Sequence, residues 1–414
     1  MTPAPLIAPF VPWLPSDTAP AEVPAAGTAH HADRDEPVAL AGARLAVKDV
    51  IDVQGAPTGS GHPLLLAAAA PAPAHAAAVA RLLSAGARYA GKTHTDELAY
   101  SLGGTNAHYG TPANPAAPGR LTGGSSSGTA AAVAGGLADV GLGTDTAGSI
   151  RVPASYCGLY GLRPTHARAD RRGIAPLAPS FDTPALLTRT LPLLTEAAAA
   201  LLAGTPRDDR PARRVLVPAD LWGCAADGVR AALRPRADRL GRALGVPMDA
   251  APLFSDGAPC AHADARDAFT LVQAAEVWRA HGPWVGRARP VFGPHVAERL
   301  ARAERVTPEA EAAARATVAR LASWLHHRLD GAILAIPATP TPAPPYGTSV
   351  PASGDRAALL ALTCVAGLGG LPALTLPVAR VGGLPVGLCL LGAPGADECL
   401  LRTAPALRRS GSAG

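Results

Sequence analysis

The spacing of hydrophobic residues in the N-terminal third of the chain switches between the period of a strand and that of a helix. Apolar positions alternate over residues 43–51 (ARLAVKDVI), which predicts a strand with one buried face. Residues 75–86 (HAAAVARLLSAG) have the spacing of an amphipathic helix that ends at a glycine, and residues 87–92 (ARYAGK) indicate another short strand. This β-α-β order predicts a layered α/β fold.

The same two periods return after a long segment rich in glycine and proline, residues 103–128, whose length inside a domain is typical of a functional loop. Residues 127–137 (SGTAAAVAGGL) predict a buried, alanine-rich helix. Residues 190–330 have a mostly helical pattern with one strand at 213–219. The C-terminal part predicts three more strands and a last helix, at residues 331–338, 371–378 and 386–392 and from Asp397.

Composition divides the chain into an arm and one domain. Residues 1–36 are rich in proline, alanine and polar residues, which predicts an N-terminal arm. We expect residues 37–408 to form a single domain, because this length is within the range of one large α/β domain. Its expected parts are a core at about 40–185, a variable helical middle at about 190–330, and C-terminal strands and a helix at 331–408.

Charge and cysteine content argue against several classes of function. The net charge of +5 does not come from a basic block, since the densest cluster, Arg168 to Arg172, includes Asp170. The six cysteines form no C-x-x-C pair, and the histidines form no H-E-x-x-H motif. We therefore expect no nucleic-acid partner, no metal and no cofactor.

The pattern contains no recognisable targeting or membrane signal. The first residues, MTPAPLIAPFVPWLP, lack a positively charged region, and prolines break each apolar run. No run of 18 apolar residues occurs in the sequence. The sequence therefore predicts a cytoplasmic protein with reduced thiols and no membrane partner, and we expect a monomer or a homodimer.

Lysine is almost absent from the chain. Only Lys48 and Lys92 occur, against 35 arginines. Lysine can lose its proton when it is buried, whereas arginine cannot, so each lysine either marks a place where arginine cannot serve or is a chance survivor. Lys48 precedes Asp49 at the end of the first predicted strand, where a surface ion pair is the simpler interpretation.

Two glycine-rich segments could carry chemistry. Residues 123–128 (GGSSSG) lack the lysine of a phosphate-binding loop, and they lead into an apolar helix, unlike a flexible linker. They also match a G-x-S-x-G nucleophile elbow centred on Ser126, an alternative disfavoured because no strand precedes it and no histidine follows His327. In residues 143–149 (GTDTAGS), small residues let backbone N–H groups converge on an oxyanion, although a tight turn ending at Ser149 is the simpler interpretation.

Taken together, these segments resemble the amidase signature family. The resemblance is dense at about residues 40–185 and resumes at 355–405. It includes AVKDVID around Lys48, GKTHTDELA, NAHYGTPANP, GGSSSGTAAAVAGGLADVGLGTDTAGSIRVPASYCGLYGLRPT, and GLPALTLPV with GLPVGLCLLG. NAHYGTP and GGSSSG are closest in wording to indole-3-acetamide amidases of plants and their bacterial relatives. The resemblance implies a large mixed central β-sheet flanked by helices on both faces.

The resemblance also implies a role for each matching residue. It makes Ser149 the acylated nucleophile, Ser125 a bridging serine after a cis peptide bond, and Lys48 the base. It makes an oxyanion hole of four backbone N–H groups, those of Thr146, Ala147, Gly148 and Ser149. It gives supporting hydrogen bonds to Ser126 and Thr144, and a structural or electrostatic role to Lys92.

Such a triad requires a neutral lysine, because the base must take the Ser149 proton through Ser125. At a free pKa of about 10.4, only about one lysine in 2,500 is neutral at pH 7. Burial must therefore lower the pKa of Lys48 by roughly 3 units. The implied activity is hydrolysis of a small-molecule amide to an acid and ammonia or an amine, through an acyl-enzyme.

The acyl group is left open by the sequence. Position 147 is alanine where the family usually has glycine, which predicts a tuned acyl specificity and, if the position needs a positive φ, a penalty of about 1 kcal/mol. Trp278, Trp284 and Phe292 in the middle region could line a pocket or simply pack. With the resemblance they predict a hydrophobic or aryl-acetamide substrate. A glutaminase-like amidotransferase subunit, or an enzyme that transfers the acyl group to an amine, would use the same catalytic residues and remains an alternative.

Overall fold

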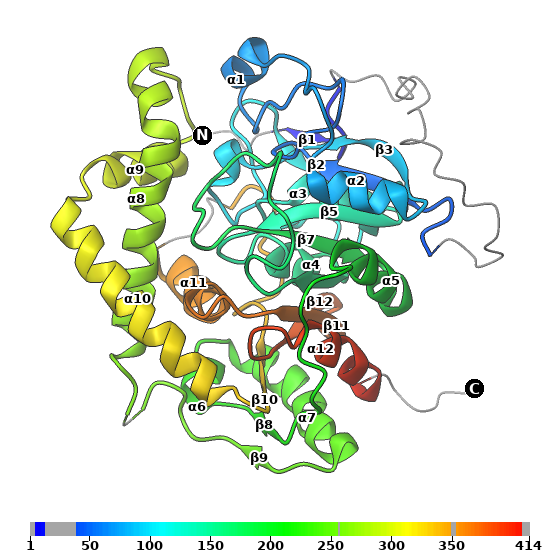
Figure 1. The fold of residues 1–414 in the computed structure, drawn as a ribbon, viewed down its shortest axis with the longest axis vertical. Coiled ribbons are helices and arrows are strands. Elements are labelled where there is room, and N and C mark those ends of the chain that lie inside the picture. The colour runs from blue at the N-terminus through cyan, green and yellow to red at the C-terminus, as the bar shows by residue number, and fades with distance from the viewer. Residues whose placement is uncertain (1–4, 13–38, 256, 349–352, 408–414) are drawn as a thin grey trace.

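The computed structural model describes residues 5–12, 39–255, 257–348 and 353–407 (Figure 1). Ten of its strands form one sheet: β2 (Arg44–Lys48), β3 (Arg88–Thr93), β5 (Val140–Asp145), β6 (Tyr160–Arg163), β7 (Thr183–Thr188), β8 (Arg214–Leu216), β9 (Met248–Asp249), β10 (Ala332–Pro337), β11 (Ala373–Val381) and β12 (Leu384–Leu391). A separate pair consists of β1 (Leu6–Ile7) and β4 (Thr111–Pro112).

The helices of the described residues are α1 (Pro63–Ala68), α2 (Ala77–Ser84), α3 (Ser127–Ala134), α4 (Arg151–Tyr156), α5 (Leu191–Leu201), α6 (Ala219–Gly223), α7 (Asp227–Leu244), α8 (His262–Ala288), α9 (Pro294–Glu304), α10 (Pro308–Arg328), α11 (Ser353–Leu368) and α12 (Asp397–Thr403). Two 3-10 turns lie at Glu97–Ala99 and Ala404–Leu407.

The large sheet is mixed. Its strand order is β3-β2-β5-β7-β6-β11-β12-β10-β8-β9, which descends from β3 to β9 in Figure 1. Neighbouring strands are parallel from β3 to β5 and from β10 to β9, and antiparallel between β5 and β10. Parallel neighbours need crossover connections, so helices must cross the faces of the sheet.

Alternating residues of β2 point into two different cores. Leu45 and Val47 belong to a large core with side chains of α2, α5 and α7, whereas Ala46 belongs to a smaller core with α3 and α4. Helices therefore cover both faces, and the predicted mixed α/β sheet is confirmed. Because successive side chains of a strand point to opposite faces, Lys48 shares the face of Ala46, on the side of α3.

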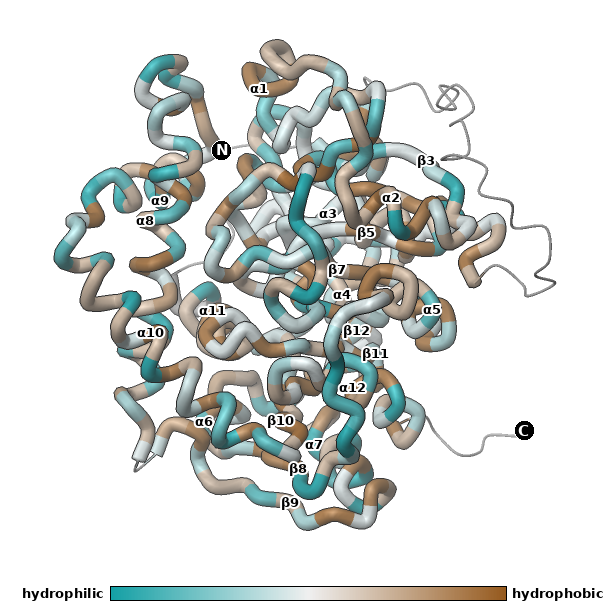
Figure 2. The backbone as a smooth tube through the Cα atoms, viewed as in Figure 1, coloured by the Kyte–Doolittle hydropathy of each residue, from teal (hydrophilic) through white to brown (hydrophobic). Residues whose placement is uncertain are grey.

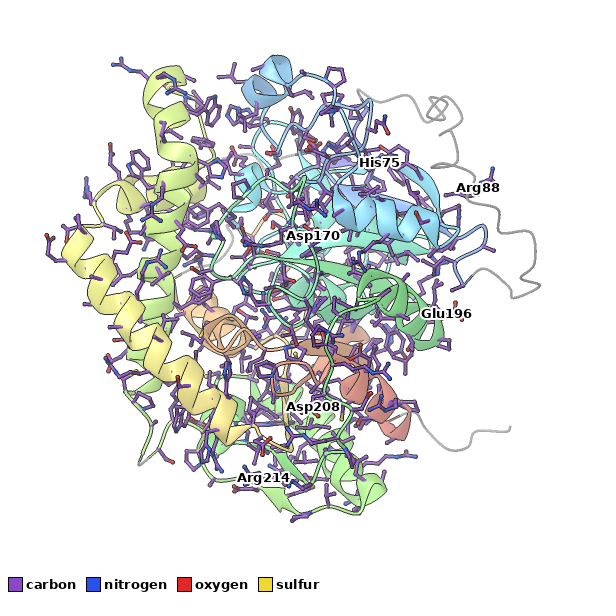
Figure 3. All side chains as sticks on the ribbon, in the orientation of Figure 1. His75, Arg88, Asp170, Glu196, Asp208 and Arg214 are labelled. Carbon is purple, nitrogen blue, oxygen red and sulfur yellow. The ribbon has the colours of Figure 1, made fainter. Side chains whose placement is uncertain are left out.

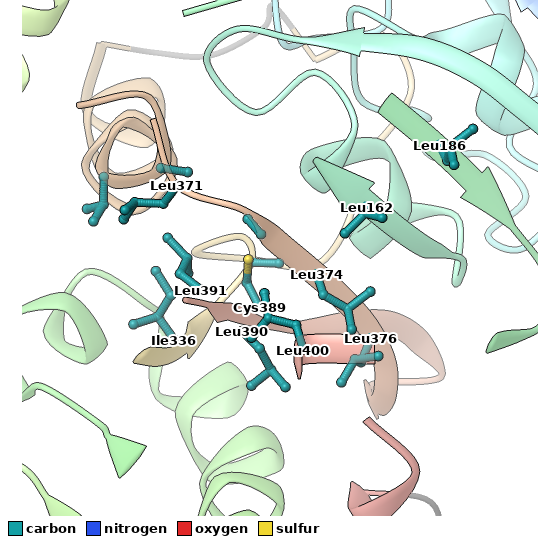
Figure 4. Close-up of a cluster of buried hydrophobic side chains, with 14 of the residues drawn as sticks. Leu162, Leu186, Ile336, Leu371, Leu374, Leu376, Cys389, Leu390, Leu391 and Leu400 are labelled. Atoms are coloured by element: carbon teal, nitrogen blue, oxygen red, sulfur yellow. The ribbon is translucent and has the colours of Figure 1, made fainter. Parts of the chain in front are cut away.

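Large aliphatic side chains fill the core between β10, β11 and β12 (Figure 4). Leu374, Leu390 and Ile336 surround the thiol of Cys389, and each is almost fully buried. Burying one such side chain stabilises the fold by about 1.5–3 kcal/mol. The few aromatic residues are thus not needed to build this core.

Residues 190–330 are mostly helical, as predicted. The predicted strand at 213–219 is observed as β8, and β9 is an additional strand that the pattern did not indicate. Helices α8, α9 and α10 pack together beside α11, on one side of the sheet in Figure 1. Their tubes mix hydrophilic and hydrophobic segments in Figure 2, as expected for helices with one buried face.

The hydrophobic pattern missed β5 because two of its residues are glycines. Gly141 and Gly143 lie on the face of β5 toward α3, where a Cβ atom at Gly143 would lie 2.6 Å from Ser126 Oγ. The missing side chains let the start of α3 approach the sheet. The same glycines weaken the alternation on which strand prediction depends.

Part of the predicted N-terminal arm lies against the sheet. Residues 6–7 pair with β4, and the Val11 N–H donates to the carbonyl oxygen of Lys92 at 3.0 Å. The rest of the arm, 1–4 and 13–36, lies outside the described residues. None of the helices in the described ranges is long and apolar enough to cross a membrane.

Arginines are spread over the surface of the described structure. Arg88 and Arg214 lie at separate edges of the view in Figure 3. Many arginines pair with carboxylates, as Arg44 Nε does with Asp139 at 2.9 Å. The positive net charge therefore has no single focus in this part of the chain.

Candidate active site

Three side chains that are far apart in the sequence meet on the α3 face of the sheet. Lys48 Nζ lies 2.8 Å from Ser125 Oγ, and Ser125 Oγ lies 3.0 Å from Ser149 Oγ. All three residues are buried. Hydroxyl hydrogens rotate to suit their partners, so protons can be passed in either direction along these hydrogen bonds. Ser125 thus bridges the lysine and Ser149.

Each of the three lies at the end or start of a regular element. Lys48 is the last residue of β2, Ser125 lies just before α3, and Ser149 lies just before α4. The peptide bond between Gly124 and Ser125 is cis. The hydroxyl of Thr95 donates to the carbonyl oxygen of Ser125 at 3.0 Å, which holds the backbone at this point.

The surroundings of Lys48 are hydroxyl groups. Besides Ser125, its ammonium donates to Thr144 Oγ1 at 2.9 Å, and no carboxylate of the described residues forms an ion pair with it. Burial lowers the pKa of Lys48 to about 7, partly opposed by the more distant charges of Asp96, Asp145 and Asp182. A lysine with this pKa is neutral in about half of the molecules at pH 7.

The turn that carries Ser149 is held by the carboxylate of Asp145. This carboxylate accepts from the backbone N–H groups of Gly148 and Ile150 at 3.1 and 3.2 Å. It also pairs with the buried guanidinium groups of Arg151 and Arg163 at 2.8 and 3.1 Å. Burial opposes its ionisation, but these two arginines bring the pKa of Asp145 well below its usual range. The turn is therefore tied to a permanent charge.

A second carboxylate, Asp182, braces the other side of the turn. It accepts from Thr146 Oγ1 at 2.6 Å and from the backbone N–H groups of Leu177 and Ala178 at 2.9 Å. It thereby joins the segment before β7 to the residues before Ser149. Neither Asp145 nor Asp182 was predicted from the sequence.

Four backbone N–H groups were expected to form an oxyanion hole, and one of them is already engaged. The N–H of Gly148 donates to Asp145, whereas no acceptor of the described residues takes the N–H groups of Thr146, Ala147 or Ser149. The φ of Gly148 is 119°, while Ala147 is not among the described non-glycine residues with positive φ. The penalty foreseen for alanine at position 147 therefore does not arise.

Ser126 and Thr144 lie where supporting hydrogen bonds are useful. Ser126 Oγ lies 3.4 Å from the carbonyl oxygen of Thr144, and the Ser126 N–H donates to the carbonyl oxygen of Ser149 at 3.4 Å. Thr144 Oγ1 is the second partner of Lys48. Ser126 itself is not hydrogen-bonded to Lys48, so the elbow centred on it gains no support from the geometry.

A cavity of about 260 Å³ opens beside Ser149. Its walls come from the 3-10 turn after β3, the turn before α4, and helices α8, α9 and α11. The lining residues are Ala99, Tyr100, Ser101, Leu102, Thr146, Ala147, Ser149, Leu177, Gln273, Arg299 and Arg356.

Known proteins resemble this chain along most of its length. A family model described as Amidase matches residues 17–221. Amidase 1 of Oryza sativa subsp. japonica is 36% identical over 389 residues, which cover 87% of this chain and 89% of that protein. The chain belongs to the amidase signature family.

Two further relatives agree with this assignment. One component of the glutamyl-tRNA(Gln) amidotransferase of Akkermansia muciniphila is 34% identical over 423 residues, which cover 89% of this chain and 86% of that protein. A solved structure described as a crystal structure of amidase is 34% identical, with a TM-score of 0.79, and covers 89% of this chain and 84% of its own. The protein is thus an amide-hydrolysing enzyme of the amidase signature fold.

The second lysine of this amidase lies in a different environment from the first. Lys92 Nζ lies 2.9 Å from Asp49 Oδ1 and donates to the carbonyl oxygen of Pro57 and to Thr58 Oγ1 at 2.9 and 2.7 Å. Three acceptors match the three protons of an ammonium group. This arrangement agrees with the structural role expected for Lys92.

The aromatic residues expected to shape the pocket of the amidase do not line the cavity beside Ser149. Trp284 and Phe292 pack against each other and against His62, with ring centroids 5.1–6.0 Å apart. Trp278 lies beside Gly282 on α8. Packing therefore explains these residues, and the expectation of a pocket role was wrong for this cavity.

Metal-binding clusters are equally missing from the described parts of this amidase. Nowhere in them do three or more histidine, cysteine, aspartate or glutamate side chains gather as metal ligands would.

Proposed function

We propose that this amidase hydrolyses a carboxylic acid amide through an acyl-enzyme on Ser149, with Ser125 and Lys48 as the proton relay. The observation that carries the proposal is the unbroken pair of hydrogen bonds, 2.8 and 3.0 Å long, that ends at a buried lysine. The pKa of that lysine, about 7, supports a base that is available near neutral pH.

In the first step Ser149 Oγ forms a bond to the amide carbonyl carbon. Its proton passes to Ser125, whose own proton passes to the neutral amine of Lys48. The carbonyl oxygen becomes an oxyanion, which the N–H groups of Thr146, Ala147 and Ser149 are available to stabilise. Loss of one such donor typically lowers a rate by about 100- to 1,000-fold.

In the second step the carbon–nitrogen bond breaks and the proton returns from Lys48 through Ser125 to the leaving nitrogen. Ammonia or an amine departs, and the acyl group stays on Ser149. Water then attacks the ester while the same relay takes its proton, and the acid is released with Ser149 restored. The residues of this chain thus complete the cycle by proton transfer and hydrogen bonding.

The acyl-enzyme is the test of this proposal. We expect ammonia release from at least one primary amide of a panel, and an acyl group on Ser149 in samples quenched with acid during turnover. The tryptic peptide that spans residues 121–151 contains both Ser125 and Ser149, so fragmentation by mass spectrometry must place the added mass. Turnover with the acyl group on another residue would contradict the proposal.

The pH profile tests the role of Lys48. Only the neutral amine accepts a proton, so kcat/KM should rise with pH around the lysine pKa of about 7. At pH 6 about one tenth of the molecules have neutral Lys48, and above about pH 8 the profile should level off. The measurement is kcat/KM between pH 5 and 9, with the range of stable folding checked by circular dichroism. A flat profile would rule out titration of the base in this range.

The nature of the acyl group is narrowed by the cavity. Of the aromatic residues, only Tyr100 lines it, which removes the structural reason for an aryl-acetamide substrate. The methyl group of Ala147 lies at the wall, so the hypothesis that it tunes acyl specificity is retained.

Two alternatives share these residues and stay open to experiment. One of the relatives is part of an amidotransferase, which makes a glutaminase-like role one candidate. Activity of the isolated chain without partner proteins would argue against that role. Amide product from an acyl donor plus an amine, in excess over free acid, would favour acyl transfer.

A further inference from the structure

Two arginines from different helices line the cavity beside Ser149. Arg299 belongs to α9 and is 5% exposed, and Arg356 belongs to α11 and is partly buried. They are more than 50 residues apart in the chain, and 150 or more residues separate each of them from Ser149. The fold therefore brings two cations to a cavity that adjoins the nucleophile.

Neither arginine has a carboxylate partner within ion-pair distance in the described ranges. Arg299 donates to the carbonyl oxygen of Tyr100 and lies over its ring, 5.6 Å from the centroid. Arg356 Nε is buried and has no hydrogen-bond partner among the residues that the structure describes. The other deeply buried arginines of the site, Arg151 and Arg163, share the carboxylate of Asp145.

The charges around the pair do not neutralise it. Asp96 acts on Arg299 from a distance, and Glu298 acts on Arg356, but Arg302 adds a third positive charge near both. Burial, and then the neighbouring Arg356, lower the pKa of Arg299 to about 10, so it stays charged at neutral pH. A buried cation without a partner is costly, and an anion in the cavity would offset that cost.

The remaining walls suit a short carbon chain. Leu102, Leu177 and Ala147 supply apolar surface between the arginines and Ser149. Gln273 is 3% exposed, lines the same cavity, and makes no side-chain hydrogen bond to the described residues. The cavity therefore combines a nucleophile, an apolar stretch and a cluster of hydrogen-bond donors.

We infer that the substrate is the monoamide of a short dicarboxylic acid, whose free carboxylate is bound by Arg356 and Arg299 while its amide reaches Ser149. This inference rests on the proposed amidase function and specifies its substrate class. Guanidinium groups bind carboxylates through paired hydrogen bonds, and the buried Nε of Arg356 is a donor that no described residue engages.

The test compares amides that differ only in the carboxylate. Succinamate is paired with butanamide, and glutaramate with pentanamide, and indole-3-acetamide serves as an aryl amide. For the wild-type enzyme we expect kcat/KM for at least one carboxylated amide to exceed that of its neutral partner by about 100-fold. The ratio within a pair does not depend on how much of the enzyme is folded.

The variant Arg356→Gln should lower this ratio about 100-fold, since it removes one charge from the bound pair. Arg356 has no carboxylate partner to lose within the described residues, and it does not hold the Tyr100 backbone as Arg299 does. The matched control is Arg279→Gln on α8, where the arginine is exposed and paired with Glu311 at 2.8 Å. This control should leave the ratio unchanged.

The outcomes separate this inference from the proposed function. Ser149-dependent turnover of a neutral or aryl amide, equal to or faster than that of the carboxylated amides, would overturn the inference alone. An unchanged ratio in Arg356→Gln would also overturn it. Turnover that does not require Ser149 would overturn the proposed function itself.

Discussion

Replacing Ser149 with alanine should lower kcat/KM for the best amide of the panel by about 10⁵- to 10⁶-fold, to the level left by binding and the oxyanion hole. The loss is this large because the variant has no oxygen with which to form the acyl-enzyme. The turn itself should survive, since Asp145 holds it through the backbone of Gly148 and Ile150 and not through the Ser149 side chain. The measurement is ammonia release at saturating and subsaturating substrate.

Ser155→Ala provides the matched control for this prediction. Ser155 is a buried serine on α4 whose hydroxyl is bonded to Thr339 at 2.9 Å and accepts from the Gly387 N–H at 3.0 Å. Its loss should destabilise the fold by about 1–3 kcal/mol, seen as a lower Tm, while kcat/KM stays within about tenfold. If Ser149→Ala kept substantial turnover, Ser149 would not be the nucleophile.

The sheet was predictable where side chains alternate and hidden where they do not. The pattern of residues 43–51 indicated β2 because Leu45 and Val47 enter one core and Ala46 the other. In β5 the positions toward α3 are glycines, so the period of two is not visible in the letters. A close approach of helix to strand thus removes the signal by which the strand would be recognised.

The candidate triad could be named from the sequence because its chemistry restricts residue choice. Lys48 was singled out as one of two lysines among 35 arginines, before any distance was available. Ser125 and Ser149 came from the family resemblance, and the structure now gives the distances between them. Whether they act as proposed is a question for the experiments above.

Asp145 and Asp182 could not be found by the same reasoning. Each acts on backbone N–H groups several residues away, and nothing in a sequence marks which amide a carboxylate will accept from. The one available signal was an aspartate inside the low-charge segment GTDTAGS. Arg299 and Arg356 were hidden for the opposite reason, because the chain has 35 arginines and only burial without a carboxylate distinguishes these two.

The two lysines separate once their partners are compared. Lys92 has a carboxylate and two further acceptors, which suits a permanent ammonium group. Lys48 has two hydroxyls, and hydroxyls can donate to a neutral amine as well as accept from a charged one. The environment of Lys48 therefore permits both protonation states, whereas that of Lys92 favours one.

Arginine at position 48 should accordingly fail where a mere positive charge would succeed. We expect Lys48→Arg to lower kcat/KM by about 10⁴-fold or more, because a guanidinium cannot give up its proton to act as the base. Lys48→Met, which removes the charge at similar length, should lose a similar factor. Lys92→Arg keeps a cation beside Asp49 and should stay within about tenfold of the wild type.

The residual activity provides a readout that misfolding would not imitate. In Lys48→Arg and Lys48→Met the rise of kcat/KM around pH 7 should disappear, while Lys92→Arg should retain it. Thermal unfolding of each variant establishes that the comparison concerns folded protein. If Lys48→Arg retained both the rate and the pH profile of the wild type, proton transfer to Lys48 would not be part of the mechanism, and the charge alone would explain why a lysine lies at the end of β2.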